Sequence, residues 1–82
     1  MFTENTTKID LHGFDRDYAR IKTNEFINDS YKEGKRYIKV IHGNGEGILK
    51  KEVHNLLRKH KLVEKFEINM FNAGETLITL KK

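Results

Sequence analysis

Two short clusters of polar residues and glycines in this chain could carry chemistry. The first is Asp10-Leu11-His12-Gly13, and the second is His42-Gly43-Asn44-Gly45-Glu46-Gly47. Each cluster follows a predicted strand and precedes a predicted helix. Ligands of open α/β sheets gather at the carboxyl ends of the strands, so the two clusters can meet in the fold although they are far apart in sequence. Together they supply a carboxylate, two imidazoles and a glycine-rich turn, which are the groups that cleavage of a phosphodiester needs.

The first cluster places an acid and an imidazole two residues apart. Side chains at this spacing on a strand project to the same face, so Asp10 can orient the imidazole of His12 and fix its tautomer. His12 would then suit a general base or a general acid. The spacing leaves one alternative open, an ordinary Asp and His on the exposed face of an edge strand.

The second cluster combines His42 with three glycines in five residues, more than a simple turn requires. Glycines allow the backbone to approach a ligand closely, and the amides at a helix N-terminus favour an anion. The spacing fits neither a dinucleotide-binding fingerprint nor a P-loop, which needs Gly-Lys-Ser or Gly-Lys-Thr. The residues expected to contact phosphate are Gly13, Gly43, Asn44, Gly45, Gly47, Lys39 and Lys50.

Composition sets the class of protein. Eighty-two residues make one domain, and we expect a flexible tail at 1–7 and a folded domain at 8–82. The absence of cysteine removes disulfides and thiolate chemistry, and no signal peptide or transmembrane stretch is recognisable, so the cytoplasm is the expected location. A net charge of +4 suits a polyanionic partner.

Hydrophobic periodicity predicts a two-layer α/β sandwich of order β-α-β-α-β-β. We expect a four-stranded mixed sheet with both helices on one face, because crossovers that step in the same direction place their helices on the same side. The other face would stay open to a partner. Strands are predicted at 8–12, 36–41, 63–70 and 76–81, helices at 15–33 and 46–60, and a turn around Gly74 at 72–75. We interpret His54 and His60, six residues apart, as structural or surface residues, since this spacing does not form a helical zinc site.

The two clusters, at their separation, resemble the small MutS-related (Smr) domain family. That family is marked by a Leu-Asp-Leu-His/Arg-Gly segment and a His-Gly-x-Gly segment, similar to residues 9–13 and 42–45 here. A closing Gly-x-Thr strand is similar to residues 74–80. The resemblance covers about residues 8 to 81 and implies a fold like the C-terminal domain of bacterial translation initiation factor three.

The resemblance also implies nicking or endonuclease activity on DNA or RNA. By motif position, the catalytic residues would be Asp10, His12 and His42, and the His form of the first motif is the one associated with cleavage. In this family the domain occurs in a MutS paralogue, in plant organelle RNA-binding proteins and in short proteins that act on mRNA at stalled ribosomes. Nucleic acid, and in that setting the ribosome, are the implied partners.

The residues themselves leave the nature of the substrate open. On RNA a base could activate the 2′-hydroxyl with no cofactor, whereas DNA cleavage would need water or a hydroxide held by a divalent cation such as magnesium or manganese. Few carboxylates are available for a two-metal site, which favours RNA. Two other functions remain: a non-catalytic module that binds nucleic acid or the ribosome, and a protein-interaction domain that docks through the open sheet face. The sequence does not indicate an oligomeric state.

Overall fold

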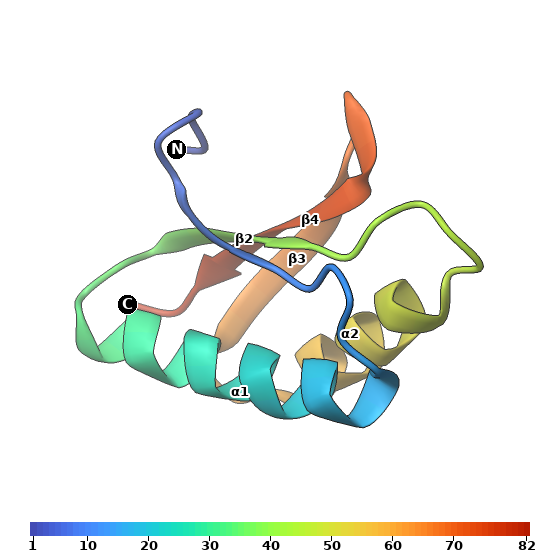
Figure 1. Cartoon of the computed structure of the whole chain (residues 1–82). Helices are drawn as coiled ribbons and strands as arrows, with labels where there is room; N and C mark the ends of the chain where they lie inside the picture. The colour runs from blue at the N-terminus through green and yellow to red at the C-terminus, as the bar shows by residue number, and fades with distance from the viewer.

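The chain folds into four strands and two helices along residues 1–82, all described by a computed structural model (Figure 1). The order is the predicted one, β-α-β-α-β-β. The elements are β1 (Thr7–Asp10), α1 (Arg16–Lys32), β2 (Tyr37–Ile41), α2 (Ile48–Lys59), β3 (Val63–Asn69) and β4 (Asn72–Leu80).

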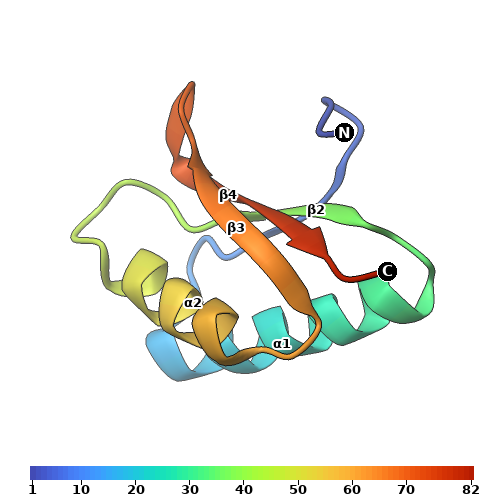
Figure 2. The same cartoon turned by 180° about the vertical axis from the view of Figure 1, so that it is seen from behind.

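The strands form one mixed sheet in the order β1-β2-β4-β3. β1 and β2 run parallel, and β4 is antiparallel to both of its neighbours, β2 and β3. Both helices cover the same face of the sheet, as the two opposite views show (Figures 1 and 2). The prediction of a two-layer α/β fold with one open sheet face is therefore confirmed.

The hydrophobic core lies between the sheet and the helices. Strand alternation places Ile38 and Val40 of β2 toward the helices, and both side chains are fully buried. Burying such side chains is the main source of stability in a domain of this size. The buried apolar residues are Leu11, Ala19, Ile27, Ile38, Val40, Val53, Leu57, Val63, Ile78 and Leu80.

The two helices begin in different ways. α1 begins after Asp15, whose carboxylate accepts a hydrogen bond from the amide of Tyr18 at 2.8 Å, and Asp17 adds a second acid to the first turn. α2 begins after Gly47, which has a φ of 81° and offers no side-chain cap, and its first turn contains no acid. The start of α1 is thus neutralised by the protein, whereas the start of α2 leaves its amides and its positive dipole end exposed.

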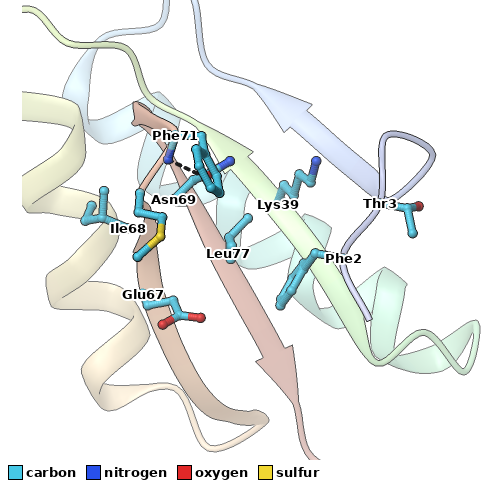
Figure 3. Close-up of a pocket in the computed structure, with 9 residues that line it drawn as sticks. Phe2, Thr3, Lys39, Glu67, Ile68, Asn69, Phe71 and Leu77 are labelled. Carbon is cyan, nitrogen blue, oxygen red and sulfur yellow. Dashed lines mark hydrogen bonds between the residues drawn. The ribbon is translucent and has the colours of Figure 1, made fainter.

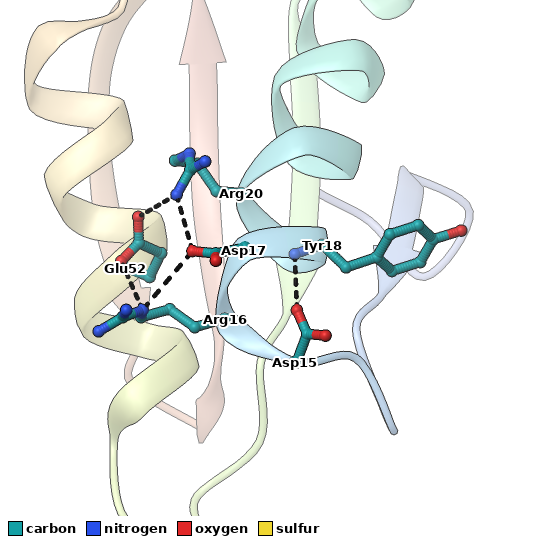
Figure 4. A network of polar contacts seen from close by, with 6 residues as sticks. All are labelled: Asp15, Arg16, Asp17, Tyr18, Arg20 and Glu52. Atoms are coloured by element: carbon teal, nitrogen blue, oxygen red, sulfur yellow. Dashed lines mark hydrogen bonds and ion pairs between the residues drawn. The ribbon is translucent and has the colours of Figure 1, made fainter.

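Arginines of α1 hold the first turns of α2 in place (Figure 4). Arg16 Nε lies 3.9 Å and Arg20 Nη1 lies 3.6 Å from the carboxylate of Glu52, and Asp17 contacts both arginines. This network fixes the glycine-rich end of α2 against α1. It also neutralises the only acid of α2, Glu52.

The prediction of a turn at residues 72–75 is wrong, because these residues belong to β4. The chain reverses at Met70 and Phe71 instead, and Asn72 already pairs with Asn69. The side chain of Asn69 stabilises this reversal by accepting a hydrogen bond from the amide of Phe71 at 3.0 Å. Two other ends also shift: β1 stops at Asp10, so His12 lies in the following turn, and α2 starts two residues later than expected.

Gly74 belongs to β4 and serves close packing rather than a turn. A Cβ atom at this position would lie 3.3 Å from both Cα and C of Gly43. The Gly74 carbonyl accepts hydrogen bonds from the amides of His42 and Gly43, each at 2.9 Å. β4 therefore anchors the start of the glycine-rich turn through direct backbone contact.

The N-terminal residues make contacts of their own. The ring of Phe2 packs edge-on against Tyr37 with centroids 5.2 Å apart, and a short turn joins Thr3 and Thr6. Neither helix has the length and apolar character needed to cross a membrane.

We predict that Gly74→Ala destabilises the fold, because the new methyl group pushes against the backbone of Gly43. Overpacking of this kind costs about 1–3 kcal/mol, measurable as a lower midpoint of urea unfolding. Gly45→Ala is the matched control, since a Cβ atom at that position would have no atom within 4 Å and the φ of Gly45 is not positive. Equal midpoints for the two variants would contradict this account of Gly74.

Candidate functional site

The two clusters lie side by side at one edge of the sheet. β1 and β2 are parallel neighbours, and the amide of Leu11 continues their ladder by donating to the carbonyl of Ile41 at 2.9 Å. The turn that carries His12 and Gly13 therefore starts beside the turn that begins at His42. The meeting of the two clusters, expected from strand order alone, is what the structure shows.

Asp10 makes a different contact from the one expected. Its carboxylate accepts a hydrogen bond from the backbone amide of His12 at 2.9 Å, and it forms no ion pair with the His12 imidazole. Asp10 thus fixes the backbone of the turn and not the ring. The side chain of His12 is exposed and has no hydrogen-bond partner within the chain.

The glycine-rich turn leaves a continuous run of backbone amides free. No N–H group of residues 44–50 donates a hydrogen bond to another group of the chain, and the pairing resumes at Lys51, whose amide donates to the carbonyl of Gly47. Gly43 and Gly47 adopt the left-handed conformation, with φ of 80° and 81°, that allows this path. Unpartnered amides that lead into a helix start are suited to bind an anion.

His42 is buried and holds the start of this turn. Its Nδ1 lies 3.1 Å from the carbonyl oxygen of Gly43, and its Nε2 lies 2.7 Å from Oγ1 of Thr76. No hydrogen bond joins His42 to His12. The structure therefore places the two imidazoles predicted to act together in separate surroundings, one buried and one exposed.

His54 lies close to His42, a proximity that the sequence did not predict. Its Nε2 lies 2.8 Å from the same Thr76 hydroxyl, and its ring packs near those of His42 and Phe66, with centroids 5.9 Å and 5.0 Å away. The spacing of Lys50, His54 and Arg58, four residues apart, signals a shared helix face. Only the register of β4 shows that Thr76 bridges the two histidines.

Burial shifts the pKa of both bridged histidines downward. For His42 the cause is removal of the ring from water, reinforced by the nearby charge of Lys50 and opposed by the Gly43 carbonyl and Glu75. For His54 burial again dominates, with His42, Arg58 and Lys50 adding to it. Both rings are therefore neutral near pH 7.

The predicted cations differ in their surroundings. Lys50 lies in the first turn of α2, forms no ion pair and borders the glycine-rich turn. Lys39 lies on the open sheet face, where its Nζ is 3.6 Å from Glu75 Oε1 and its side chain is mostly buried. Of the two lysines, only Lys50 is free to meet a phosphate.

A separate apolar groove crosses the open sheet face near the β3–β4 turn (Figure 3). The rings of Phe2 and Phe71 and the side chain of Leu77 border it, together with Lys39. Phe71 and Met70 are 91% and 87% exposed at the tip of the hairpin. This groove lies apart from the histidines and the glycine-rich turn.

The structure contains no group of three or more His, Asp or Glu side chains that lie close enough together to bind a metal ion.

Comparison with known proteins identifies the family. Residues 9–81 match the Smr domain family. The chain belongs to the Smr domain family. It is 34% identical over 74 residues to a protein named Endonuclease MutS2 of Clostridium kluyveri and 33% identical over 72 residues to its namesake in Caldicellulosiruptor saccharolyticus. These matches cover 90% and 88% of this chain but only 9% of each relative.

Solved structures confirm the Smr fold. The Smr domain of Thermus thermophilus MutS2 matches 94% of this chain and all of that domain, with a TM-score of 0.91 and 24% identity. YdaL, described as a stand-alone small MutS-related protein of Escherichia coli, matches 95% of this chain and 66% of that protein, with a TM-score of 0.89 and 20% identity. The Smr resemblance noted from the motifs is confirmed.

We predict that the fold loses stability as the pH falls from 7.5 to 5. The unfolded histidines titrate near pH 6.5, whereas the folded His42 and His54 stay neutral to lower pH, so the unfolded state binds more protons in this window. Their contribution is complete above about pH 6.5 and is lost as the pH drops through the folded pKa values. Thermal unfolding midpoints should fall accordingly, and His54→Asn should flatten the fall. Equal unfolding midpoints at pH 7.5 and pH 5 would contradict this explanation. So would a midpoint that falls as steeply with pH in His54→Asn as in wild type.

Proposed function

We propose that this Smr domain binds a nucleic-acid strand at the edge shared by the two clusters and cleaves a phosphodiester bond there. The observation that carries the proposal is the run of free amides at residues 44–50, in a turn whose start lies next to the start of the turn that carries the exposed His12. The name of the MutS2 relatives supports the same class of reaction. The MutS2 relatives are many times longer than this domain, and we propose that the activity in their name resides in it.

The free amides would hold the phosphate. Their N–H groups, the dipole of α2 and the side chain of Lys50 all favour negative charge, and no acid of the first helical turn opposes it. Gly13 and the residues Gly43, Asn44, Gly45 and Gly47 would let the backbone approach the phosphate oxygens. Donors placed in advance stabilise the charge that develops there as the bond breaks.

His12 would transfer the proton. On RNA it takes the proton of the 2′-hydroxyl, the 2′-oxygen attacks phosphorus, and the bond from phosphorus to the 5′-oxygen of the next nucleotide breaks. Water protonates the leaving 5′-oxygen, and the His12 imidazolium returns its proton to the solvent, which yields a 2′,3′-cyclic phosphate and a 5′-hydroxyl. On DNA, which lacks the 2′-hydroxyl, water must attack, and a magnesium or manganese ion could activate it. Asp10 acts by fixing the turn that carries His12, and His42 acts by fixing the glycine-rich turn.

A non-catalytic module that binds nucleic acid is the second candidate. The observation that favours it is the missing contact between Asp10 and the His12 imidazole, since bases in active sites are commonly oriented by a third group. Such a module would show salt-sensitive binding but leave every substrate intact. Action on mRNA at stalled ribosomes, a role in DNA repair and a cytoplasmic location are finer proposals, which depend on the substrate found.

We predict that His12→Ala lowers cleavage about 100-fold or more, while affinity for the substrate stays within a few-fold of wild type. The measurement is incubation with labelled single-stranded RNA, duplex DNA and supercoiled plasmid, with and without a chelator. His60→Ala, which removes an imidazole from the far end of α2, is the control and should cleave like wild type.

Two results decide between the candidates. Cleavage that survives in purified His12→Ala would remove His12 from the reaction. Binding without any cleavage by wild type, on all three substrates and with added magnesium or manganese, would overturn the proposed activity and favour the binding module.

A further inference from the structure

His42, Thr76 and His54 are joined by two hydrogen bonds. When both rings are neutral, only one assignment of donors and acceptors is possible. The Gly43 carbonyl can only accept, so Nδ1 of His42 carries the proton and its Nε2 must accept from the Thr76 hydroxyl. The Thr76 oxygen then accepts from Nε2–H of His54. The remaining nitrogen of His54, Nδ1, is left as a bare acceptor with no partner in the chain.

His54 also borders a basic hollow on the outer face of α2, which we name the α2 hollow. It has a volume of about 350 Å³ and is lined by Gly47, Lys50, Lys51, His54 and Arg58. None of its three cations forms an ion pair, whereas six other Lys and Arg residues do, namely Arg16, Arg20, Lys22, Lys35, Arg36 and Lys39. The hollow is thus a site of uncompensated positive charge.

The α2 hollow continues the run of free amides. Gly47 is both the last residue of the glycine-rich turn and a wall of the hollow, and the rise of an α-helix places His54 about 10 Å further along the axis. A strand with one phosphate on the amides would therefore place its neighbouring nucleotide against Lys50, Lys51 and Arg58. A neutral imidazole among these cations has an acceptor to offer but no positive charge, so it suits a hydroxyl donor better than a phosphate oxygen.

We propose that the α2 hollow binds a ribose-phosphate unit, in which the cations hold the phosphate and Nδ1 of His54 accepts a hydrogen bond from the ribose 2′-hydroxyl. This inference rests on the proposed function for the position of the strand. The 2′-hydroxyl is the group by which a protein distinguishes RNA from DNA. Because the hydrogen bonds through Thr76 leave Nδ1 of His54 as an acceptor, His54 would recognise the 2′-hydroxyl. RNA would therefore bind more tightly than DNA.

The experiment measures binding, separately from cleavage, in the His12→Ala background. The probes are three fluorescently labelled single strands of one sequence, composed of RNA, DNA or 2′-O-methyl RNA. RNA should bind about 2- to 10-fold more tightly than the other two, the range expected for one hydrogen bond. His54→Phe should reduce RNA affinity to the DNA level and leave DNA affinity unchanged, and His60→Phe, the same change outside the hollow, should keep the preference.

A further variant tests the phosphate contacts. Arg58→Ala should weaken the binding of RNA and of DNA equally. For both strands the slope of log affinity against log salt concentration should become shallower by slightly less than one, because one phosphate contact is lost. Equal binding of RNA and 2′-O-methyl RNA to the unaltered hollow would overturn the inference. This comparison changes only the probe, so a misfolded variant cannot explain its result. A preference for RNA that persists in His54→Phe would overturn it as well.

The outcome separates the two proposals. If wild type cleaves nothing but the preference for RNA depends on His54, the ribose site stands and the proposed activity fails. If cleavage depends on His12 but RNA and 2′-O-methyl RNA bind equally, the activity stands and the ribose site fails.

Discussion

The parallel pairing of β1 and β2 is the constraint on which the site depends. Because both strands run in the same direction, their carboxyl ends reach the same edge, and the hydrogen bond from Leu11 to Ile41 extends the pairing to the start of both turns. A parallel pair needs a crossover, which α1 supplies. Two segments that are far apart in the chain thereby start side by side.

The glycine-rich turn that starts there presents unpartnered backbone amides. Folded proteins pair nearly all of their buried backbone amides. Here residues 44–50 pair none within the chain, because left-handed glycines turn the backbone and the glycine before α2 has no side chain to cap it. α1 differs, because Asp15 caps its start and Asp17 adds a negative charge there. The residues at each helix start therefore decide whether its amides are left without a partner.

Much of this arrangement could be predicted from the sequence. Alternation in the strands, the helix cap at Asp15 and the glycines that follow β1, α1 and β2 indicate the element order and the edge where the clusters meet. The position of the chain reversal could not be predicted, because Asn72 and Gly74 are typical turn residues, whereas Gly74 is required for close contact with Gly43, a contact that only the tertiary fold creates. The contact of His54 with Thr76 could not be predicted for the same reason, because it depends on which residue of β4 lies opposite α2.

The most direct test of the account is to observe the amides themselves. In ¹⁵N–¹H spectra recorded during titration with a single-stranded oligodeoxynucleotide at low salt, the amide signals of residues 44–50 should shift most, because their N–H groups gain phosphate acceptors. The shifts should reverse as salt is added. If those signals stay in place while signals around the groove of Phe2, Lys39 and Phe71 move, the glycine-rich turn does not hold the phosphate and the account is contradicted.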